Sequence, residues 1–155
     1  MLLSVVIPAF NEELYLQETL SRLHDAISLC PCCAEIIVVD NESVDRTAEV
    51  ARSFGAAVVR ESVHNIARVR NAGANVARGD VLAFVDADTS VPPNFLERIA
   101  EVMGDAACMG GSADIVHTPA SRFYEPIWRR GAGSELDWEW PKALPSSVGS
   151  PLSPS

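Results

Sequence analysis

Basic residues are scarce in this sequence. It has 12 lysines and arginines against 21 aspartates and glutamates, which gives a net charge of −9. Binding to a nucleic-acid backbone needs a basic surface, so the composition argues against nucleic acid as a partner. The single lysine, Lys142, lies near the C-terminus, which argues against a receiver-type phosphoacceptor with a lysine in its acidic pocket. A small pocket can still bind phosphates through a metal ion and a few arginines.

Long apolar runs are also missing. No stretch approaches the roughly 20 apolar residues that a membrane helix needs, so we expect no transmembrane segment. Residues 1–10 are apolar, but they lack a basic leader and a small-residue cleavage site, and Glu12 and Glu13 follow directly. We therefore expect a first strand rather than a signal peptide. A cytoplasmic location is the expectation, with peripheral attachment to a membrane left open.

The cysteines are few, and their spacing does not match that of a structural zinc site. Three of the four lie together as Cys30-Pro31-Cys32-Cys33, and the fourth is Cys108. A structural zinc site needs paired spacings and four ligands, which this arrangement does not provide. We expect reduced thiols in a loop.

Short apolar runs, typical of buried strands, alternate with helical periodicity up to about residue 116. Strands are expected at Leu3–Ile7, Ile36–Val39, Ala57–Arg60, Val81–Val85 and Ala107–Val116. Helices are expected at Glu12–Leu29, Asp45–Phe54, Asn65–Arg78 and after Pro92-Pro93, with Gly55 and Gly79 as stops. This order predicts an α/β fold with a mainly parallel sheet flanked by helices on both faces.

The last part of the chain has a different composition. In residues 131–155, 13 of 25 residues are Gly, Pro or Ser, and no apolar periodicity remains. Such a segment cannot bury enough surface to offset its ordering entropy, so we expect a disordered tail. The predicted organisation is a domain over residues 1–117, a partial helix or linker over 118–130, and the tail over 131–155.

Polar residues follow three of the predicted strands. Ligands of parallel sheets bind beyond the carboxyl ends of the strands, so these residues are candidates for a site. The segments are Pro8–Glu12, Asp40–Ser43 and Asp86–Asp88.

Asp86 and Asp88 are the most informative of these residues. Alternate residues of a strand point the same way, so both carboxylates can converge on one ligand. Mg²⁺ or Mn²⁺ typically accepts one or two carboxylates together with substrate phosphates. The alternative for this short motif is a strand-end pair that caps Thr89, Ser90 or the next helix.

The other candidates also carry alternatives. Asp40 can accept the N–H of a nucleobase, or it can cap the helix near Asp45. Phe10 can pack on a base or ribose, whereas Asn11 beside it can cap the first helix. Arg70 can approach a phosphate or form a surface ion pair.

Two classes of enzyme that use strand-end residues do not fit. A dinucleotide dehydrogenase needs Gly-x-Gly-x-x-Gly after its first strand, and Pro8–Asn11 has no glycine. A haloacid-dehalogenase-like phosphatase usually has its Asp-x-Asp near the first strand, with Thr or Val two places after the second aspartate. Here Thr89 follows Asp88 directly, and the pair lies on the fourth predicted strand.

Taken in order, the segments resemble family 2 glycosyltransferases of the GT-A fold. The resemblance is collinear over residues 3–116. The matching segments are Ser4–Glu13, Val38–Thr47, Arg70–Gly73, Ala77–Asp80 and Phe84–Asp88. It implies the Rossmann-like, nucleotide-sugar-binding half of a GT-A fold. It also implies an inverting sugar transferase that uses a nucleotide-diphosphate sugar donor and Mg²⁺ or Mn²⁺.

The resemblance also implies roles for individual residues. The expected donor-binding residues are Pro8, Ala9, Phe10, Asn11, Glu12, Asp40, Arg70, Asn71, Asp86, Ala87 and Asp88. Of these, Asp88 and Asp86 are the expected metal ligands.

The C-terminal part departs from the family. Inversion needs a carboxylate base on the acceptor side, and Glu135, Asp137 and Glu139 do not resemble its motif. The base and the acceptor therefore stay unassigned, and we expect a truncated or frameshifted form of a longer gene. The leading hypothesis is a donor-binding glycosyltransferase domain. The alternative is an inactive nucleotide-sugar-binding module, and an exposed core edge would favour self-association.

Overall fold

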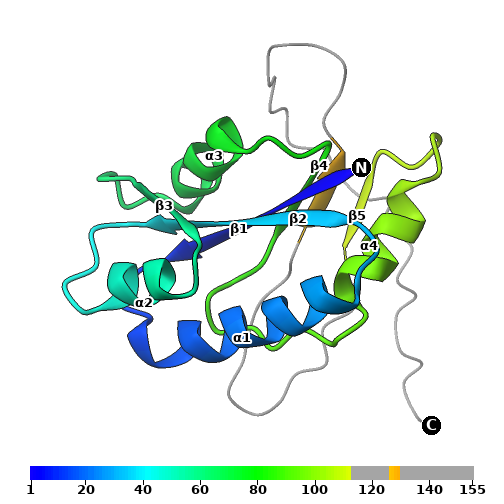
Figure 1. Cartoon of the computed structure of the whole chain (residues 1–155). Helices are drawn as coiled ribbons and strands as arrows, with labels where there is room; N and C mark the ends of the chain where they lie inside the picture. The colour runs from blue at the N-terminus through cyan, green and yellow to red at the C-terminus, as the bar shows by residue number, and fades with distance from the viewer. Residues whose placement is uncertain (113–125, 130–155) are drawn as a thin grey trace, which may run out of the picture.

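The computed structural model describes residues 1–112 and 126–129 (Figure 1). The strands are β1 (Leu2–Ala9), β2 (Cys33–Asp40), β3 (Ala57–Arg60), β4 (Val81–Phe84), β5 (Gly110–Ser112) and β6 (Pro126–Arg129). The helices are α1 (Glu13–Leu29), α2 (Thr47–Ser53), α3 (Ile66–Val76) and α4 (Phe95–Met103). The predicted tail, with Glu135, Asp137 and Glu139, lies outside the described residues.

The sheet has the order β3-β2-β1-β4-β6-β5. The first four strands are parallel, which confirms the predicted α/β fold with a mainly parallel sheet. β6 pairs antiparallel with β4, and β5 pairs antiparallel with β6. β6 lies within residues 118–130, for which the sequence predicted a partial helix or linker. The four residues of β6, Pro-Ile-Trp-Arg, begin with a proline, which is uncommon inside strands and hides the signal.

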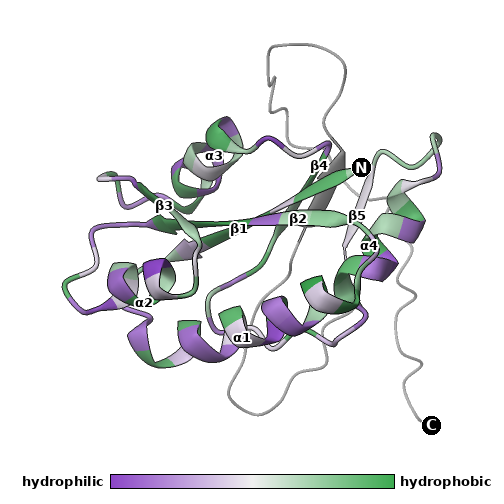
Figure 2. Cartoon of the chain, viewed as in Figure 1, coloured by the Kyte–Doolittle hydropathy of each residue, from purple (hydrophilic) through white to green (hydrophobic). Residues whose placement is uncertain are grey.

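Helices cover both faces of the parallel strands (Figure 1). On one face, α1, α2 and α4 pack on alternate residues of β1, β2 and β4, such as Val5, Val38 and Ala83. On the other face, α3 packs on the intervening residues, including Val6 and Val39. The parallel strands are accordingly mainly apolar, whereas the helices alternate apolar and polar residues (Figure 2). This division decides which side chains can reach a site on the α3 face.

Two glycines allow the helices to fit this arrangement. Gly55 has a φ of +75° directly after the C-cap of α2, as expected of a left-handed stop. Gly73 lies where α3 crosses the sheet, and a Cβ there would overlap the side chains of Val6 and Val39. The close approach of α3 brings its first turn to the carboxyl ends of β1 and β2.

The cysteine loop differs from expectation. Cys30 and Cys32 form a disulfide with a Cα–Cα distance of 5.2 Å, so the prediction of reduced thiols is wrong for this pair. Cys33 and Cys108 are free. The cause is local: Cys30 follows the end of α1, and the turn through Pro31 brings the two cysteines together. In the described part of the chain, none of the helices has the length and apolarity required to span a bilayer.

Candidate functional site

A cleft of about 290 Å³ lies beyond the carboxyl ends of β1, β2 and β4, beside the first turns of α3. Its walls come from four segments that are distant in the sequence. The lining residues are Pro8, Ala9, Phe10, Glu12, Asn41, His64, Asn65, Ile66, Val69, Arg70, Asp86, Ala87 and Asp88. The position is the one at which parallel sheets bind ligands.

Alternate residues of a strand point to the same face of the sheet, and this parity explains which strand-end residues line the cleft. Val6, Val39 and Phe84 belong to the core beneath α3. Pro8, Asn41 and Asp86 follow these three residues by two positions, so they continue the same face of the sheet. All three line the cleft.

Asp86 is bound to an arginine of α3. The Arg70 Nη2 atom donates to Asp86 Oδ1 at 3.0 Å, and the guanidinium carbon lies 6.0 Å from the centre of the Phe84 ring. Burial raises the pKa of Asp86; the nearby Arg70 opposes the rise, and Asp88 adds to it. Among the described residues, the buried Nε atom of Arg70 has no hydrogen-bond acceptor. Arg70 therefore holds Asp86 through Nη2, while its buried Nε–H stays without a partner in residues 1–112 and 126–129.

Glu12 brings a third carboxylate to the cleft. Burial raises its pKa, and the negative charges of Asp88, Asp45 and Asp86 raise it further. Such repulsion is relieved when a cation binds between the carboxylates. Within residues 1–112, however, no three His, Cys, Asp or Glu side chains are placed to hold a metal ion by themselves. Carboxylate oxygens suit Mg²⁺ or Mn²⁺, and phosphate oxygens of a ligand would complete the coordination.

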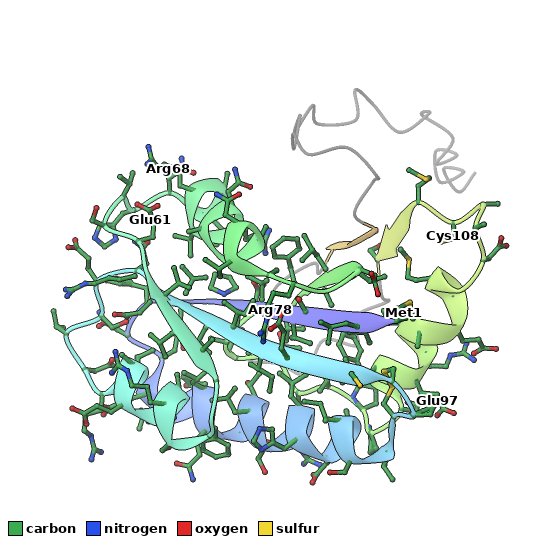
Figure 3. The ribbon with its side chains drawn as sticks, turned by 45° about the horizontal axis from the view of Figure 1, so that its top comes forward. Met1, Glu61, Arg68, Arg78, Glu97 and Cys108 are labelled. Carbon is green, nitrogen blue, oxygen red and sulfur yellow. A yellow bond between two sulfur atoms is a disulfide. The ribbon has the colours of Figure 1, made fainter. Side chains whose placement is uncertain are left out.

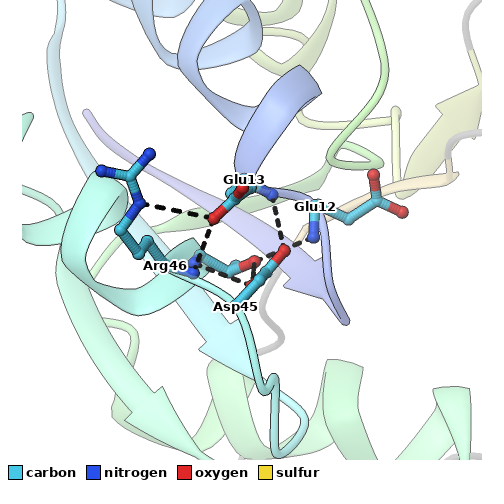
Figure 4. A network of polar contacts seen from close by, with 5 residues as sticks. Glu12, Glu13, Asp45 and Arg46 are labelled. Carbon is cyan, nitrogen blue, oxygen red and sulfur yellow. Dashed lines mark hydrogen bonds and ion pairs between the residues drawn. The ribbon is translucent and has the colours of Figure 1, made fainter.

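Glu12 is positioned by a network that joins the first turns of α1 and α2 (Figure 4). Thr47 Oγ1 accepts from the Glu12 N–H at 2.8 Å, and Asp45 Oδ2 accepts from the Glu13 N–H at 3.1 Å. In return, Glu13 Oε2 accepts from the Arg46 N–H at 2.9 Å. Each segment thus satisfies free N–H groups at the start of the other, so hydrogen bonds join the two loops into one rim of the cleft.

Asn11 does not line the cleft; it forms hydrogen bonds that hold the same rim together. It has a φ of +57°, and its Oδ1 atom accepts from the Val44 N–H at 2.8 Å. Its own N–H donates to Ser43 Oγ at 3.0 Å. The opposing loop also contains a left-handed residue, Glu42, with a φ of +61°.

The opposite wall is formed by Asn41 and the segment before α3. Asn41 is 7% exposed, and its Nδ2 atom donates to the carbonyl oxygens of Glu61 at 2.7 Å and Val63 at 3.1 Å. The His64 ring meets the Phe10 ring edge-on, with centroids 5.0 Å apart. This wall therefore combines a fixed amide with two aromatic rings.

The structure thus brings together most, but not all, of the residues expected from the sequence. Those around the cleft are Pro8, Ala9, Phe10, Glu12, Arg70, Asp86, Ala87 and Asp88. Asn11, Asp40 and Asn71 are not among the lining residues. Asp40 has the opposite parity to Asn41, and its Oδ1 atom accepts from the Ser43 N–H at 3.1 Å. This bond closes the loop after β2; it lies four residues before the start of α2 at Thr47, so it is not the helix cap of the alternative.

Sequence reasoning missed four lining residues, His64, Asn65, Ile66 and Val69, and it gave Asn41 no role of its own although this residue lies in the candidate segment Asp40–Ser43. For Asn41 a signal was present, because it continues the parity of Ile37 and Val39. For the residues around the start of α3 a signal was also present, because the segment after β3 lies at the same carboxyl edge of the parallel sheet, but the rule was not extended to this strand.

Comparisons with known proteins identify the family and the fold of the chain. The model of the family "Glycosyl transferase family 2" matches residues 4–143. An undecaprenyl-phosphate 4-deoxy-4-formamido-L-arabinose transferase of Pseudomonas paraeruginosa is 33% identical over 92% of this chain and 40% of its own length. The chain thus spans about two fifths of the length of that curated relative.

Two solved structures are similar in both fold and sequence. Staphylococcus aureus TarS 1–349, in complex with UDP-GlcNAc, has a TM-score of 0.59 and 25% identity over 67% of this chain and 31% of its own. Glucosyl-3-phosphoglycerate synthase of Mycobacterium tuberculosis, in complex with Mn²⁺, UDP and its product, has a TM-score of 0.54 and 26% identity. That match covers 65% of this chain and 39% of the synthase.

Proposed function

Because the chain belongs to glycosyl transferase family 2 and has the GT-A fold, we propose that its cleft binds the nucleoside diphosphate of a sugar donor together with Mg²⁺ or Mn²⁺. The observation that carries the proposal is the grouping of Glu12, Asp86 and Asp88 around one cleft, with Arg70 of α3 paired to Asp86. The similar synthase crystallised with UDP and Mn²⁺ supports it.

In this proposal, Asp86 and Asp88 hold the cation. When bound, the cation would neutralise the diphosphate and so stabilise it as a leaving group. Arg70 supplies a fixed positive charge on the same side, because Asp86 holds its guanidinium in place. Phe10, at the cleft wall, offers an apolar ring on which a base or ribose can pack.

Sugar transfer to an acceptor also belongs to the proposal. The acceptor and the general base stay unassigned, because Glu135, Asp137 and Glu139 do not resemble the motif of the family's base. Neither the cytoplasmic location nor self-association has been tested, so both stay predictions.

Calorimetric titration of UDP- and GDP-sugars, with and without Mn²⁺, tests donor binding. We expect metal-dependent binding by the wild-type chain. Asp88→Ala should weaken it by about 100-fold or more, because even the loss of an outer partner of a metal ligand costs about 10- to 100-fold. The matched control is Asp80→Ala, which removes an aspartate that binds the Leu2 N–H at the other end of the sheet. Equal, metal-independent binding by wild type and Asp88→Ala would refute the metal site.

A transfer assay then separates the two functional hypotheses. Release of sugar from the donor, or its transfer to an acceptor, supports the transferase. Metal-dependent binding without turnover supports the binding module.

A further inference from the structure

We propose that Thr19, on the buried face of α1, positions the loop that carries Asp86 and Asp88, so that both carboxylates reach the cation of the bound nucleotide. Thr19 is not among the residues that line the cleft. It is a positioning residue, because it acts through the backbone of Ala87 and touches neither cation nor nucleotide. The inference rests on the proposed function and deepens it, since it names a residue outside the cleft on which the metal site depends.

Thr19 is a polar residue on an otherwise apolar face of α1. The other buried residues of this helix are Leu16, Leu20, Leu23 and Ala26. Thr19 is 2% exposed, and a hydroxyl buried in this way is costly unless it forms a hydrogen bond. Threonine is also a poorer helix former than alanine or leucine. Neither helix propensity nor apolar burial therefore explains a hydroxyl at this position.

The hydroxyl finds its partner in the loop after β4, which runs back to α1 (Figure 1). Thr19 Oγ1 donates to the carbonyl oxygen of Ala87 at 2.7 Å, across 68 positions of sequence. The carbonyl oxygen of Tyr15, the usual acceptor for a threonine inside a helix, lies 3.4 Å away. A hydroxyl has one hydrogen to donate, so the shorter contact with Ala87 takes it.

Ala87 is the residue between the two aspartates. It belongs to the apolar cluster that contains Leu16 and Leu20 of α1, whereas Asp86 and Asp88 line the cleft. Its carbonyl group is part of the peptide that joins Ala87 to Asp88. A hydrogen bond to this carbonyl therefore fixes the backbone from which the Asp88 side chain extends.

Two further hydrogen bonds restrain the same loop. The Val85 N–H donates to the carbonyl oxygen of Val6 at 3.0 Å, which ties the start of the loop to β1. The Thr89 N–H donates to the carbonyl oxygen of Asp86 at 3.1 Å, which closes a turn around the aspartates. The bond from Thr19 acts on the peptide between these two and sets the distance of the turn from α1.

The same helix also carries the third carboxylate of the cleft. Glu12 is the N-cap residue of α1, and its carbonyl oxygen accepts from the Leu16 N–H at 2.9 Å. Thr19 follows about two turns later, or about 10 Å along the helix. One helix thus sets the place of Glu12 directly and that of the Asp86–Asp88 loop through Thr19. Because Mg²⁺ and Mn²⁺ favour a regular octahedron of oxygens, a shift of this loop weakens the site.

The test is calorimetric titration of the chain with UDP at a series of Mn²⁺ concentrations. The readout is the Mn²⁺ concentration that gives half-maximal UDP binding. Thr19→Val removes the hydroxyl and should raise this concentration about tenfold or more, because the loss of an outer partner of a metal site costs about 10- to 100-fold. Thr19→Ser retains the hydroxyl and should stay within about threefold of the wild type.

Stability is measured beside binding, as the midpoint of urea denaturation. Thr19→Ser loses a buried methyl group, so its midpoint should fall although its Mn²⁺ requirement does not change. Leu23→Val is the matched control, because Leu23 lies one turn further along the same face of α1. It should also lower the midpoint and leave the Mn²⁺ requirement unchanged. A merely structural Thr19 would behave like Leu23 in both measurements.

A second variant covers the case in which Thr19→Val does not fold. Thr19→Ala also lacks the hydroxyl but is a better helix former, and it should show the same tenfold or greater rise. Failure of both variants to fold would show that the bond serves the fold as a whole, and would overturn the inference.

The remaining outcomes separate the inference from the proposed function. Absence of UDP binding by the wild-type chain, or binding that does not depend on Mn²⁺, overturns the proposed function and the inference with it. Metal-dependent binding by the wild type with an unchanged Mn²⁺ requirement in folded Thr19→Val or Thr19→Ala overturns the inference alone. The same holds if Thr19→Ser loses as much Mn²⁺ affinity as Thr19→Val.

Discussion

The two ends of the parallel sheet each carry acidic side chains, but those at the amino end are paired with hydrogen-bond donors, whereas those at the carboxyl end crowd around the cleft. At the amino end, Glu35 accepts from Ser4 Oγ at 2.7 Å, from the Arg78 N–H at 2.7 Å and from the Arg78 guanidinium at 2.7 and 3.0 Å (Figure 3 labels Arg78). At the carboxyl end, Glu12, Asp86 and Asp88 crowd around the cleft with Arg70 as the arginine among the lining residues.

The pKa shifts at the two ends have opposite signs. Burial raises the pKa of Glu35, but the hydrogen bonds from Ser4 and Arg78 outweigh it and lower the pKa below its ordinary value of 4.5. Burial and neighbouring negative charges raise the pKa of Glu12 above the same value. A satisfied carboxylate stabilises the fold, whereas a group of repelling carboxylates costs stability and is typical of a ligand site.

The largest effect on stability is expected at Gly79, beside Glu35. A Cβ there would lie 2.6 Å from Ser4 Oγ, 2.7 Å from Ser4 N and 2.9 Å from Leu2 O, so backbone would have to move. We expect Gly79→Ala to lower the free energy of unfolding by about 1–3 kcal/mol in urea denaturation. Gly111→Ala, with no atom within 4 Å of its Cβ, is the matched control. A stable Gly79→Ala would show that the amino end is not closely packed.

A smaller loss is expected from Glu35→Gln. The charge-assisted hydrogen bonds are worth about 1–2 kcal/mol here, since Glu35 is 16% exposed but the Arg78 side chain is 79% exposed and well screened. Because the folded-state pKa is lowered, this stability is present above pH 4.5 and is lost as the pH falls through the folded-state value. Urea melts of both proteins at pH 7 and pH 3 should therefore converge at the lower pH. A constant difference would rule out the charge as its source.

The smallest effect has the opposite sign. Glu12→Gln should raise the free energy of unfolding at pH 7 by less than about 1 kcal/mol, because water still reaches this side chain. A raised folded-state pKa means that the cost of Glu12 is absent below pH 4.5 and grows as the pH rises through the folded-state value. The gain should therefore vanish in acid. Glu97→Gln on the exposed side of α4 is the control, and destabilisation by Glu12→Gln at pH 7 would contradict the comparison.

The carboxylates of the cleft could be predicted from sequence for a simple reason. Parallel strands end at the same edge, so residues such as Glu12, Asp86 and Asp88 had to lie near one another. The expectation for Asp40 did not consider on which face of the sheet this residue continues, and Asn41, on the opposite face, is the one that lines the cleft. The sequence gives the parity of each residue, and the face of the sheet follows once it is known which helices pack on that face.

Other features depend on contacts that leave no local pattern. β6 owes its existence to pairing with β4, and its four residues carry no periodic signal. The Cys30–Cys32 disulfide depends on the turn after α1. The contact of His64 with Phe10 requires the two loops to meet in space.

The most direct test of the account is the position of bound Mn²⁺ in the ¹⁵N-labelled chain with UDP, read from paramagnetic broadening of backbone amide signals. The broadening falls steeply with distance, and β1, at eight residues, extends about 25 Å between the two ends of the sheet. We predict that Glu12, Ala87 and Asp88 lose their signals first while Glu35 and Gly79 keep theirs. Broadening centred on Glu35 and Gly79, or spread evenly over both ends, would contradict the assignment of the cleft as the metal-nucleotide site.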